Sequence, residues 1–200
     1  MLSFVKCATP NCDDYAVTGS QHCSVHSESL ESLQARETAL LGPGQNYFRL
    51  NLSGLPVEGV DLSGSTFSSC RFTGSQFRKV NFAKCVFRLC VFDFSTFEEC
   101  TLTELDSMYT ILGGARIAHC DFSNSEILHT SLNGVVCSDT SFNDSNLYFS
   151  RFVGARLTRV TFVDCNLKKV LFLSAQLEQV SFKYSNYEEA EFGEDPVGAL

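Results

Sequence analysis

A large apolar residue returns at every fifth position of this sequence from Leu52 to Phe192, without a single insertion. These 29 central positions hold 14 Phe, 9 Leu and 2 Ile, and the others are Val57, Ser107, Cys137 and Tyr187. Two residues before each of them lies a small position, most often Ser, Cys, Ala or Val. A helix repeats near 3.6 residues and a strand near 2, so a period of five fits neither.

The period predicts a coil in which each side is one five-residue unit. The large and the small residue of every unit then both point inward. Four sides make a turn of 20 residues, and successive turns stack at the strand spacing of about 4.8 Å. We therefore predict an all-β solenoid of about seven coils, in which residues 20 apart lie in one column.

Four segments carry a family resemblance: VDLSG (60–64), VNFAK (80–84), CDFSN (120–124) and CNLKK (165–169). They resemble the pentapeptide-repeat family, whose unit reads A-[DN]-[LF]-x-x. The resemblance covers about 70% of the chain. It implies a right-handed quadrilateral β-helix over residues 46–193.

Seven of the ten cysteines follow the repeat, six at small positions and one at a central position. We interpret these as core packing, because free cysteine behaves as a small hydrophobic residue. They are Cys70, Cys85, Cys90, Cys100, Cys120, Cys137 and Cys165.

The other three cysteines lie in residues 1–27, a short polar segment with no core of its own. Cys7, Cys12, Cys23 and His26 are spaced as C-x₄-C and C-x₂-H, which predicts a structural Zn²⁺ site of the knuckle type. Similar Cys/His segments precede pentapeptide repeats in some bacterial proteins. His22 is a competing ligand, and three unligated thiols in a loose tail are the alternative.

Both ends of a solenoid need protection, since an open end exposes core and unpaired backbone. For residues 28–45 we predict a capping helix and a linker, with the helix begun by Ser27 or Ser29 and ended by Gly42 and Pro43. The helix is expected to lay one face on the first coil, formed by Leu30, Leu33, Leu40 and Leu41. Residues 194–200 form only a short tail, so the last coil is covered either by this tail or by a second copy in a homodimer.

Composition excludes several classes of partner. The net charge of −8 and the pI of about 4.9 argue against direct binding to nucleic acid or an anionic membrane. The sequence has no run of about 18 apolar residues and no apolar leader at its start. These features predict a protein of the reducing cytoplasm, where ten cysteines do not form disulfides.

Outward residues can be assigned to columns from the 20-residue turn. One column alternates in sign, with Lys79, Glu99, Asp139 and Arg159, which predicts ion pairs between turns. A second holds an acidic stripe, which either solubilises the surface or imitates the phosphates of DNA. The stripe consists of Glu104, Asp121, Asp144 and Asp164.

A third column places apolar groups where solvent is expected, which usually marks an interaction surface. It predicts a partner-binding face, or a homodimer face, unless the N-terminal segment or a distortion near Ser107 covers it. Its residues are Leu89, Met108, Tyr109, Leu128, Tyr148 and Phe149, with His129 among them.

No nucleophile elbow, phosphate loop, H-E-x-x-H or dinucleotide motif occurs, and a filled solenoid has no interior pocket. We therefore predict a protein that is not an enzyme and acts as a rigid protein-binding scaffold with an unknown partner. The alternative follows from resemblance: quinolone-resistance members of the family resemble B-DNA and bind DNA gyrase. Residues 46–200 carry a net charge of only −5, which weakens that alternative.

Overall fold

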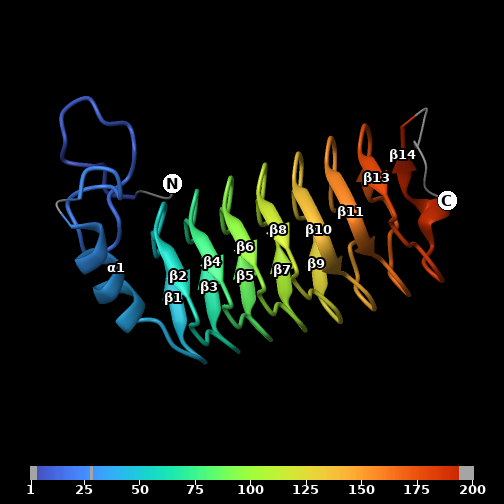
Figure 1. Ribbon diagram of the computed structural model, residues 1–200, viewed down its shortest axis with the longest axis horizontal. Helices are drawn as coiled ribbons and strands as arrows, with labels where there is room; N and C mark the ends of the chain where they lie inside the picture. The colour runs from blue at the N-terminus through green and yellow to red at the C-terminus, as the bar shows by residue number, and fades with distance from the viewer. Residues whose placement is uncertain (1–3, 28, 194–200) are drawn as a thin grey trace.

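The computed structural model describes residues 4–27 and 29–193, which form a cap followed by a regular rod (Figure 1). The elements are α1 (Leu30–Ala39), β1 (Asn46–Phe48), β2 (Pro56–Glu58), β3 (Thr66–Ser68), β4 (Gln76–Arg78), β5 (Val86–Arg88), β6 (Thr96–Glu98), β7 (Asp106–Met108), β8 (Arg116–Ala118), β9 (Glu126–Leu128), β10 (Val136–Ser141), β11 (Arg156–Thr161), β12 (Leu171–Phe172), β13 (Gln176–Glu178), a 3₁₀ turn (Tyr187–Glu189) and β14 (Glu191–Phe192).

Every strand in the rod pairs in parallel with residues 20 positions away, as Tyr47 does with Phe67. One side of the coil is the sheet β1-β3-β5-β7-β9, and another is β2-β4-β6-β8-β10-β11-β13. The other two sides are joined mainly by single bridges, such as Asn51 to Arg71 and Asp61 to Asn81. The predicted all-β solenoid of about seven turns is confirmed.

Aromatic rings fill the core along two directions. Most rings 20 residues apart stack face to face, with centroids 4.6 Å apart for Phe72 and Phe92 and 5.1 Å apart for Phe142 and Phe162. Phe67 and Phe87 are an exception and meet edge to face. Rings five residues apart meet edge to face, as Phe77 and Phe82 do at 5.3 Å. Both arrangements suit the charge distribution of an aromatic ring, so one residue type packs both along and across the coil.

The small positions contribute hydrogen bonds as well as space. Their thiols and hydroxyls donate to the carbonyl 23 residues earlier, for example Cys85 Sγ to Leu62 O at 3.0 Å and Ser95 Oγ to Phe72 O at 2.6 Å. Burial raises the pKa of Cys85 to about 12 and that of Cys165 to about 11. These thiols therefore stay protonated and unreactive, as a packing role requires.

The corners of the coil impose a backbone constraint. All 28 corner residues from Arg49 to Tyr184, one in every five, have a positive φ. None of them is proline or β-branched, because these residues tolerate the left-handed region poorly. Two conditions therefore decide which residues occupy a corner: the side chain must suit the outer surface, and the residue must tolerate a positive φ.

No distortion occurs at Ser107, contrary to the alternative that a bulge covers the apolar column. Strand β7 keeps its register with both β5 and β9. Leu105 occupies the neighbouring small position and is buried, so it replaces the volume that Ser107 lacks. A cavity of about 10 Å³ remains beside the two residues, which is room for about one water molecule.

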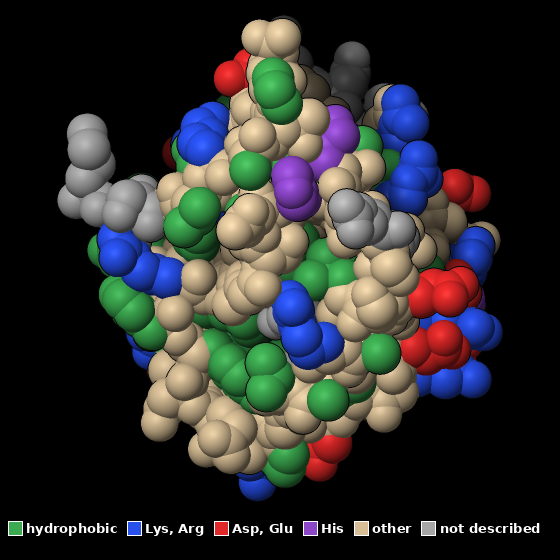
Figure 2. All heavy atoms as spheres, turned by 90° about the vertical axis from the view of Figure 1, so that its left-hand side faces the viewer, with side chains coloured by type: hydrophobic (Ala, Val, Ile, Leu, Met, Phe, Trp, Pro, Cys, Tyr) green, Lys and Arg blue, Asp and Glu red, His purple; other side chains and the backbone are tan. Residues whose placement is uncertain are grey.

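The N-terminal end of the rod is closed by two segments together. The Thr18 N–H donates to Asn51 O at 2.9 Å, and the Asn51 N–H donates to Thr18 Oγ1 at 2.7 Å. Asn51 Nδ2 also donates to Ala16 O at 2.6 Å. Val17 and Leu33, from the Cys/His segment and α1, are both buried against the first coil. The surface of this end carries only scattered hydrophobic side chains (Figure 2).

The helix differs from its prediction in two ways. Ser29 is the N-cap, since its Oγ accepts the Ser32 N–H at 3.2 Å, but the helix ends at Ala39, before Gly42. Leu33 and Leu41 face the core as expected, whereas Leu40 is 67% exposed and not part of the buried face. Beyond the helix end, Leu40 no longer follows the helical spacing. The side chain of Leu30 and the tail 194–200 lie outside the described residues.

In the described part of the chain, no helix has the length and apolar character that a membrane span requires.

The exchange of volume between Leu105 and Ser107 can be tested. We expect Leu105→Ala to lower the free energy of unfolding by roughly 3 kcal/mol, because it enlarges a core cavity. The double variant Leu105→Cys/Ser107→Phe restores the usual small and large order of the repeat and should recover most of the loss. Urea denaturation checks both variants, and a double variant no more stable than Leu105→Ala would contradict the exchange.

Candidate functional site

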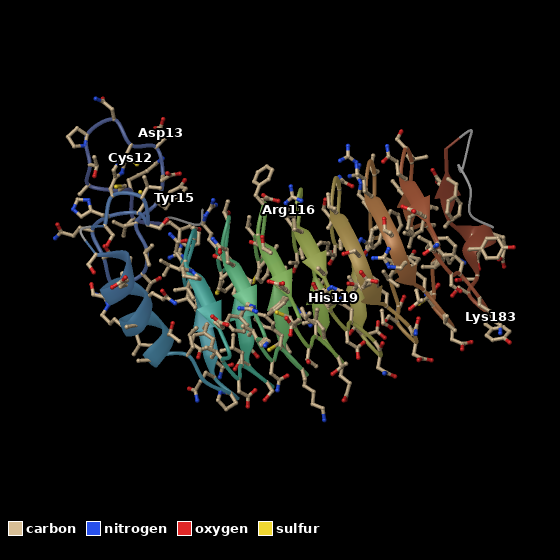
Figure 3. The ribbon with its side chains drawn as sticks, in the orientation of Figure 1. Cys12, Asp13, Tyr15, Arg116, His119 and Lys183 are labelled. Carbon is tan, nitrogen blue, oxygen red and sulfur yellow. The ribbon has the colours of Figure 1, made fainter. Side chains whose placement is uncertain are left out.

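The Cys/His segment is folded by short-range backbone contacts. Lys6 and Tyr15 form an antiparallel bridge, and the Cys7 N–H donates to Asp14 O at 3.0 Å. A tight turn carries the chain from Cys23 to His26, whose N–H donates to Cys23 O at 3.1 Å. Cys12 lies in the loop between the two bridge strands, beyond the end of the rod (Figure 3).

These turns bring all four predicted ligands together. The Sγ atoms of Cys7, Cys12 and Cys23 and a ring nitrogen of His26 all lie within 4.8 Å of one another. Cys12 Sγ and Cys23 Sγ are 3.9 Å apart, and His26 Nδ1 is 3.3 Å from Cys23 Sγ. A tetrahedral zinc with bonds of about 2.3 Å separates its sulfur ligands by about 3.8 Å, so the donor set fits such an ion.

Two further groups approach Cys7. His22 Nδ1 lies 3.9 Å from Cys7 Sγ and 3.2 Å from Thr9 Oγ1, outside the group of four. Burial alone would raise the pKa of the Cys7 thiol. Hydrogen bonds to Cys7 Sγ, chiefly the one from the Cys23 N–H, outweigh burial and lower the pKa to about 5. Cys7 therefore favours the thiolate, which is the form that binds a metal.

The third column is an exposed corner of the rod, here called the aromatic corner, made of Leu89, Tyr109, His129, Phe149 and Lys169. Ring centroids lie 5.2 Å apart between Tyr109 and His129 and 5.1 Å between His129 and Phe149. Lys169 Nζ lies 4.9 Å from the Phe149 centroid and ends the stack. Leu89 and Tyr109 are each 54% exposed and Phe149 is 43% exposed.

The other predicted residues of this face, Met108, Leu128 and Tyr148, lie beside the corner and are half-buried. The N-terminal segment contacts the opening coil of the rod, through Asn51, and the corner is left exposed. Ile111, which the sequence analysis missed, is 42% exposed next to Tyr109, and Phe94 is 74% exposed on the following corner. The repeat places Ile111 at an outward position, and this could have identified it as an exposed apolar residue.

The acidic stripe is interrupted. Glu104 pairs with Lys84 at 3.6 Å, and Asp121 accepts the Ser123 N–H at 2.9 Å. In the described part of the chain, no ion pair involves Asp144 or Asp164. Two exposed carboxylates thus remain unpaired in this column.

The column of alternating sign forms the expected ion pairs. Lys79 and Glu99 lie 3.6 Å apart, and Arg159 binds Asp139 through two contacts of 2.6 and 2.7 Å. Arg159 lowers the pKa of the Asp139 carboxyl below its usual range. Charges on this side of the rod are therefore largely neutralised by their neighbours.

Comparison with known proteins agrees with this architecture. The profile of pentapeptide repeats (8 copies) matches three overlapping segments, 50–83, 58–93 and 70–106, and that of a pentapeptide repeat region matches 115–197. No curated protein sequence is significantly similar to the chain.

Two solved structures with similar folds are distant in sequence. Full-length QnrB1, a plasmid-mediated fluoroquinolone resistance protein, is 17% identical over 72% of this chain and 93% of its own, with a TM-score of 0.35. HetL, a pentapeptide repeat protein involved in heterocyst differentiation regulation in the cyanobacterium Nostoc sp. strain PCC 7120, is 14% identical over 88% of this chain and 100% of its own, with a TM-score of 0.33.

The two profiles together match well over half of the sequence, and the structure repeats with the same five-residue unit. The chain belongs to the pentapeptide-repeat family.

Proposed function

We propose that this protein is a rigid, non-enzymatic scaffold that binds a protein partner through the aromatic corner. The observation that carries the proposal is the exposed stack of Tyr109, His129 and Phe149 on three successive turns. Contiguous exposed aromatic surface is typical of interaction sites, and Tyr is among the residues enriched in binding hot spots. The half-buried Met108, Leu128 and Tyr148 extend the surface along the same side.

The three rings occupy corner positions with a positive φ. Tyr109, His129 and Phe149 have φ values of 54°, 48° and 61°, and a bulky residue in this region costs about 1 kcal/mol. Glycine occupies the equivalent position at Gly114, Gly134 and Gly154 on the following corner, with no such cost. Every corner from Arg49 to Tyr184 shares this conformation, so what distinguishes these three residues is that their rings are exposed and cover no core.

We propose that the four donors of Cys7, Cys12, Cys23 and His26 hold one structural Zn²⁺ ion. Three thiolates and one imidazole suit zinc, and four protein ligands leave no open position for catalysis. An ion here would cross-link a segment that also supplies Val17 to the cap of the rod. Metal binding would then contribute directly to closure of the N-terminal end.

A second function, imitation of DNA towards gyrase, rests on Asp144 and Asp164. Their exposed carboxylates lie one turn apart in the same column. The ion pairs of Glu104, Glu99 and Asp139 remove the other regularly spaced charges from these columns. A DNA mimic needs a long series of unpaired anions, so the charge pattern favours the scaffold function.

We also propose a cytoplasmic location. In addition, we propose that two copies assemble through the C-terminal coil or the aromatic corner. Analytical ultracentrifugation at several protein concentrations measures whether two copies associate.

The aromatic corner can be tested by substitution. We expect Phe149→Glu or Tyr109→Glu to weaken partner binding at least tenfold while the circular dichroism spectrum stays unchanged, because the corner supports no core. Tyr184→Glu is the matched control, since Tyr184 is also an exposed aromatic residue at a corner with positive φ. Affinity purification from the source cells compares the variants. Equal recovery of the partner with Phe149→Glu and Tyr184→Glu would contradict the assignment.

Zinc removal should destabilise the cap. We expect about one zinc ion per chain, and we expect a chelator to lower the melting temperature and expose the N-terminal segment to protease. Cys12→Ser should lose the metal, whereas His22→Ala should retain it. Metal analysis by mass spectrometry decides the point, and full zinc content in Cys12→Ser would exclude the proposed ligand set.

A gyrase supercoiling assay separates the two functions. The scaffold proposal predicts no inhibition of gyrase by the zinc-loaded protein at about 10 µM. At this concentration, any inhibitory complex with a dissociation constant of about 10 µM or lower would be detected. Salt-sensitive inhibition that Asp144→Lys/Asp164→Lys abolishes would instead support the DNA mimic.

A further inference from the structure

The cysteines of this chain differ in their access to solvent. Cys12 is partly exposed in the loop between the two bridge strands, whereas each of the seven cysteines of the rod is at most 5% exposed. Burial raises the pKa of Cys85 to about 12, which keeps such a thiol protonated. Oxidants react with an accessible thiolate, and a zinc ion keeps its thiol ligands deprotonated. The loop of Cys12 is therefore the place where this chain is open to oxidation.

A second sulfur atom lies within reach of Cys12. Cys12 Sγ and Cys23 Sγ are 3.9 Å apart, and a disulfide bond is about 2.05 Å long, so the two atoms need to approach by about 2 Å. The Cys12 N–H donates to Thr9 O at 3.2 Å, within the same loop. This loop can therefore shift toward Cys23 without breaking that contact.

The third cysteine of the cluster is held more firmly. Cys7 is 7% exposed, and its Sγ accepts the Cys23 N–H at 3.4 Å and lies 3.6 Å from His26 Nδ1. Its own N–H donates to Asp14 O at 3.0 Å, across the antiparallel bridge. Cys12 and Cys23 are thus the pair that combines an exposed sulfur atom with a close partner.

We propose that Cys12 and Cys23 are a redox pair, which a hydroperoxide converts into a reversible disulfide with release of the bound zinc. This inference rests on the proposed zinc site and adds a reaction to it. It is independent of the aromatic corner.

The reaction takes two steps. The Cys12 thiolate attacks one oxygen of the hydroperoxide, the O–O bond breaks, and a sulfenic acid and a hydroxide or alkoxide ion form. The Cys23 thiolate then attacks Cys12 Sγ, the S–O bond breaks, and the disulfide forms with loss of a second hydroxide ion. Each leaving ion takes one proton from the solvent. Two thiolates are oxidised and the two peroxide oxygens are reduced, so the electrons balance.

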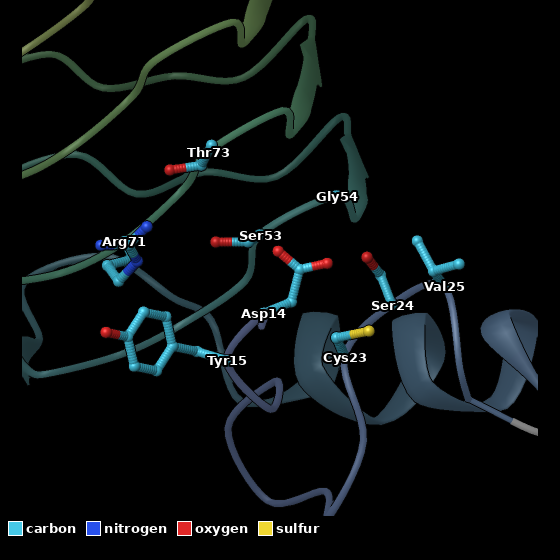
Figure 4. A pocket seen from close by; sticks show the side chains of 9 residues that line it. All are labelled: Asp14, Tyr15, Cys23, Ser24, Val25, Ser53, Gly54, Arg71 and Thr73. Atoms are coloured by element: carbon cyan, nitrogen blue, oxygen red, sulfur yellow. The ribbon is translucent and has the colours of Figure 1, made fainter. Parts of the chain in front are cut away.

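Oxidation at this place affects the junction of cap and rod. Once the disulfide has formed, only Cys7 and His26 remain as ligands, too few for a structural zinc site. Cys23 is followed by Ser24, and both line a crevice against Gly54 of the rod (Figure 4). A Cβ atom on Gly54 would lie 2.2 Å from Ser24 Oγ, so the two segments are in close contact there. Loss of the ion removes the cross-link behind this contact and loosens the cap.

Hydrogen peroxide added to the zinc-loaded full-length protein tests the proposal. A chromogenic chelator measures released zinc, and mass spectrometry of proteolytic peptides identifies the disulfide. We expect about one zinc ion per chain to be released at the rate at which the Cys12–Cys23 disulfide appears. Dithiothreitol and added zinc should restore the starting state. The seven rod cysteines are the internal control and should stay reduced.

Two variants separate the oxidation from metal binding. Cys12→His keeps a zinc ligand, because sites with two cysteines and two histidines are common, but it lacks the attacking sulfur. We expect this variant to hold zinc and to release it about tenfold more slowly in peroxide. Cys85→Ser is the matched control, since Ser95 makes the same hydrogen bond at an equivalent position. It should release zinc at the wild-type rate.

The zinc content measured before peroxide is added distinguishes the two proposals. Bound zinc that survives peroxide, with no disulfide formed, would overturn the redox pair and leave the zinc site intact. A disulfide that joins Cys7 or a rod cysteine would also overturn the pair, as would zinc release from Cys12→His at the wild-type rate. A protein without zinc before treatment would contradict the zinc site, and the mapped disulfide would still decide whether Cys12 and Cys23 pair.

Discussion

The structure depends on backbone hydrogen bonds between turns at a fixed spacing of 20 residues. Phe72 N–H donates to Val91 O at 2.7 Å, and Arg71 N–H donates to Leu50 O at 2.8 Å, and the pattern recurs along the rod. Because the register never slips, every side chain lies directly above its equivalent in the preceding turn. Core rings stack, many inward thiols and hydroxyls meet the carbonyl 23 residues earlier, and corner residues form continuous columns.

This regularity separates folding from surface chemistry. Inward positions carry the apolar burial that stabilises the coil, and corners carry side chains that pack against neighbours in adjacent turns and beside them in the same turn. Ion pairs such as Lys79–Glu99, each worth well under 1 kcal/mol, connect turns on one corner. On another corner the same geometry produces the stack of Tyr109, His129 and Phe149, which adds little to the core and exposes rings to solvent.

Most of the fold could be predicted from the sequence, because the five-residue period has few physical solutions. The cluster of four candidate metal ligands was also predictable from its spacing, and the structure brings together Cys7, Cys12, Cys23 and His26. The sequence did not predict that α1 ends at Ala39 or that Leu40 is exposed, because the end of this helix depends on contacts with the first coil. A pocket between the Cys/His segment and the rod was also unpredictable, because no repeat relates Asp14 to Thr73, which both line it.

The central claim is that the aromatic corner is a partner-binding surface, and site-specific photo-crosslinking tests it most directly. A benzophenone amino acid in place of Tyr109 reports what lies against the corner in the source cells, and the same amino acid in place of Tyr184 is the control. The account predicts one discrete adduct from position 109 and none from position 184. No adduct at position 109, or the same adduct from both positions, would contradict it.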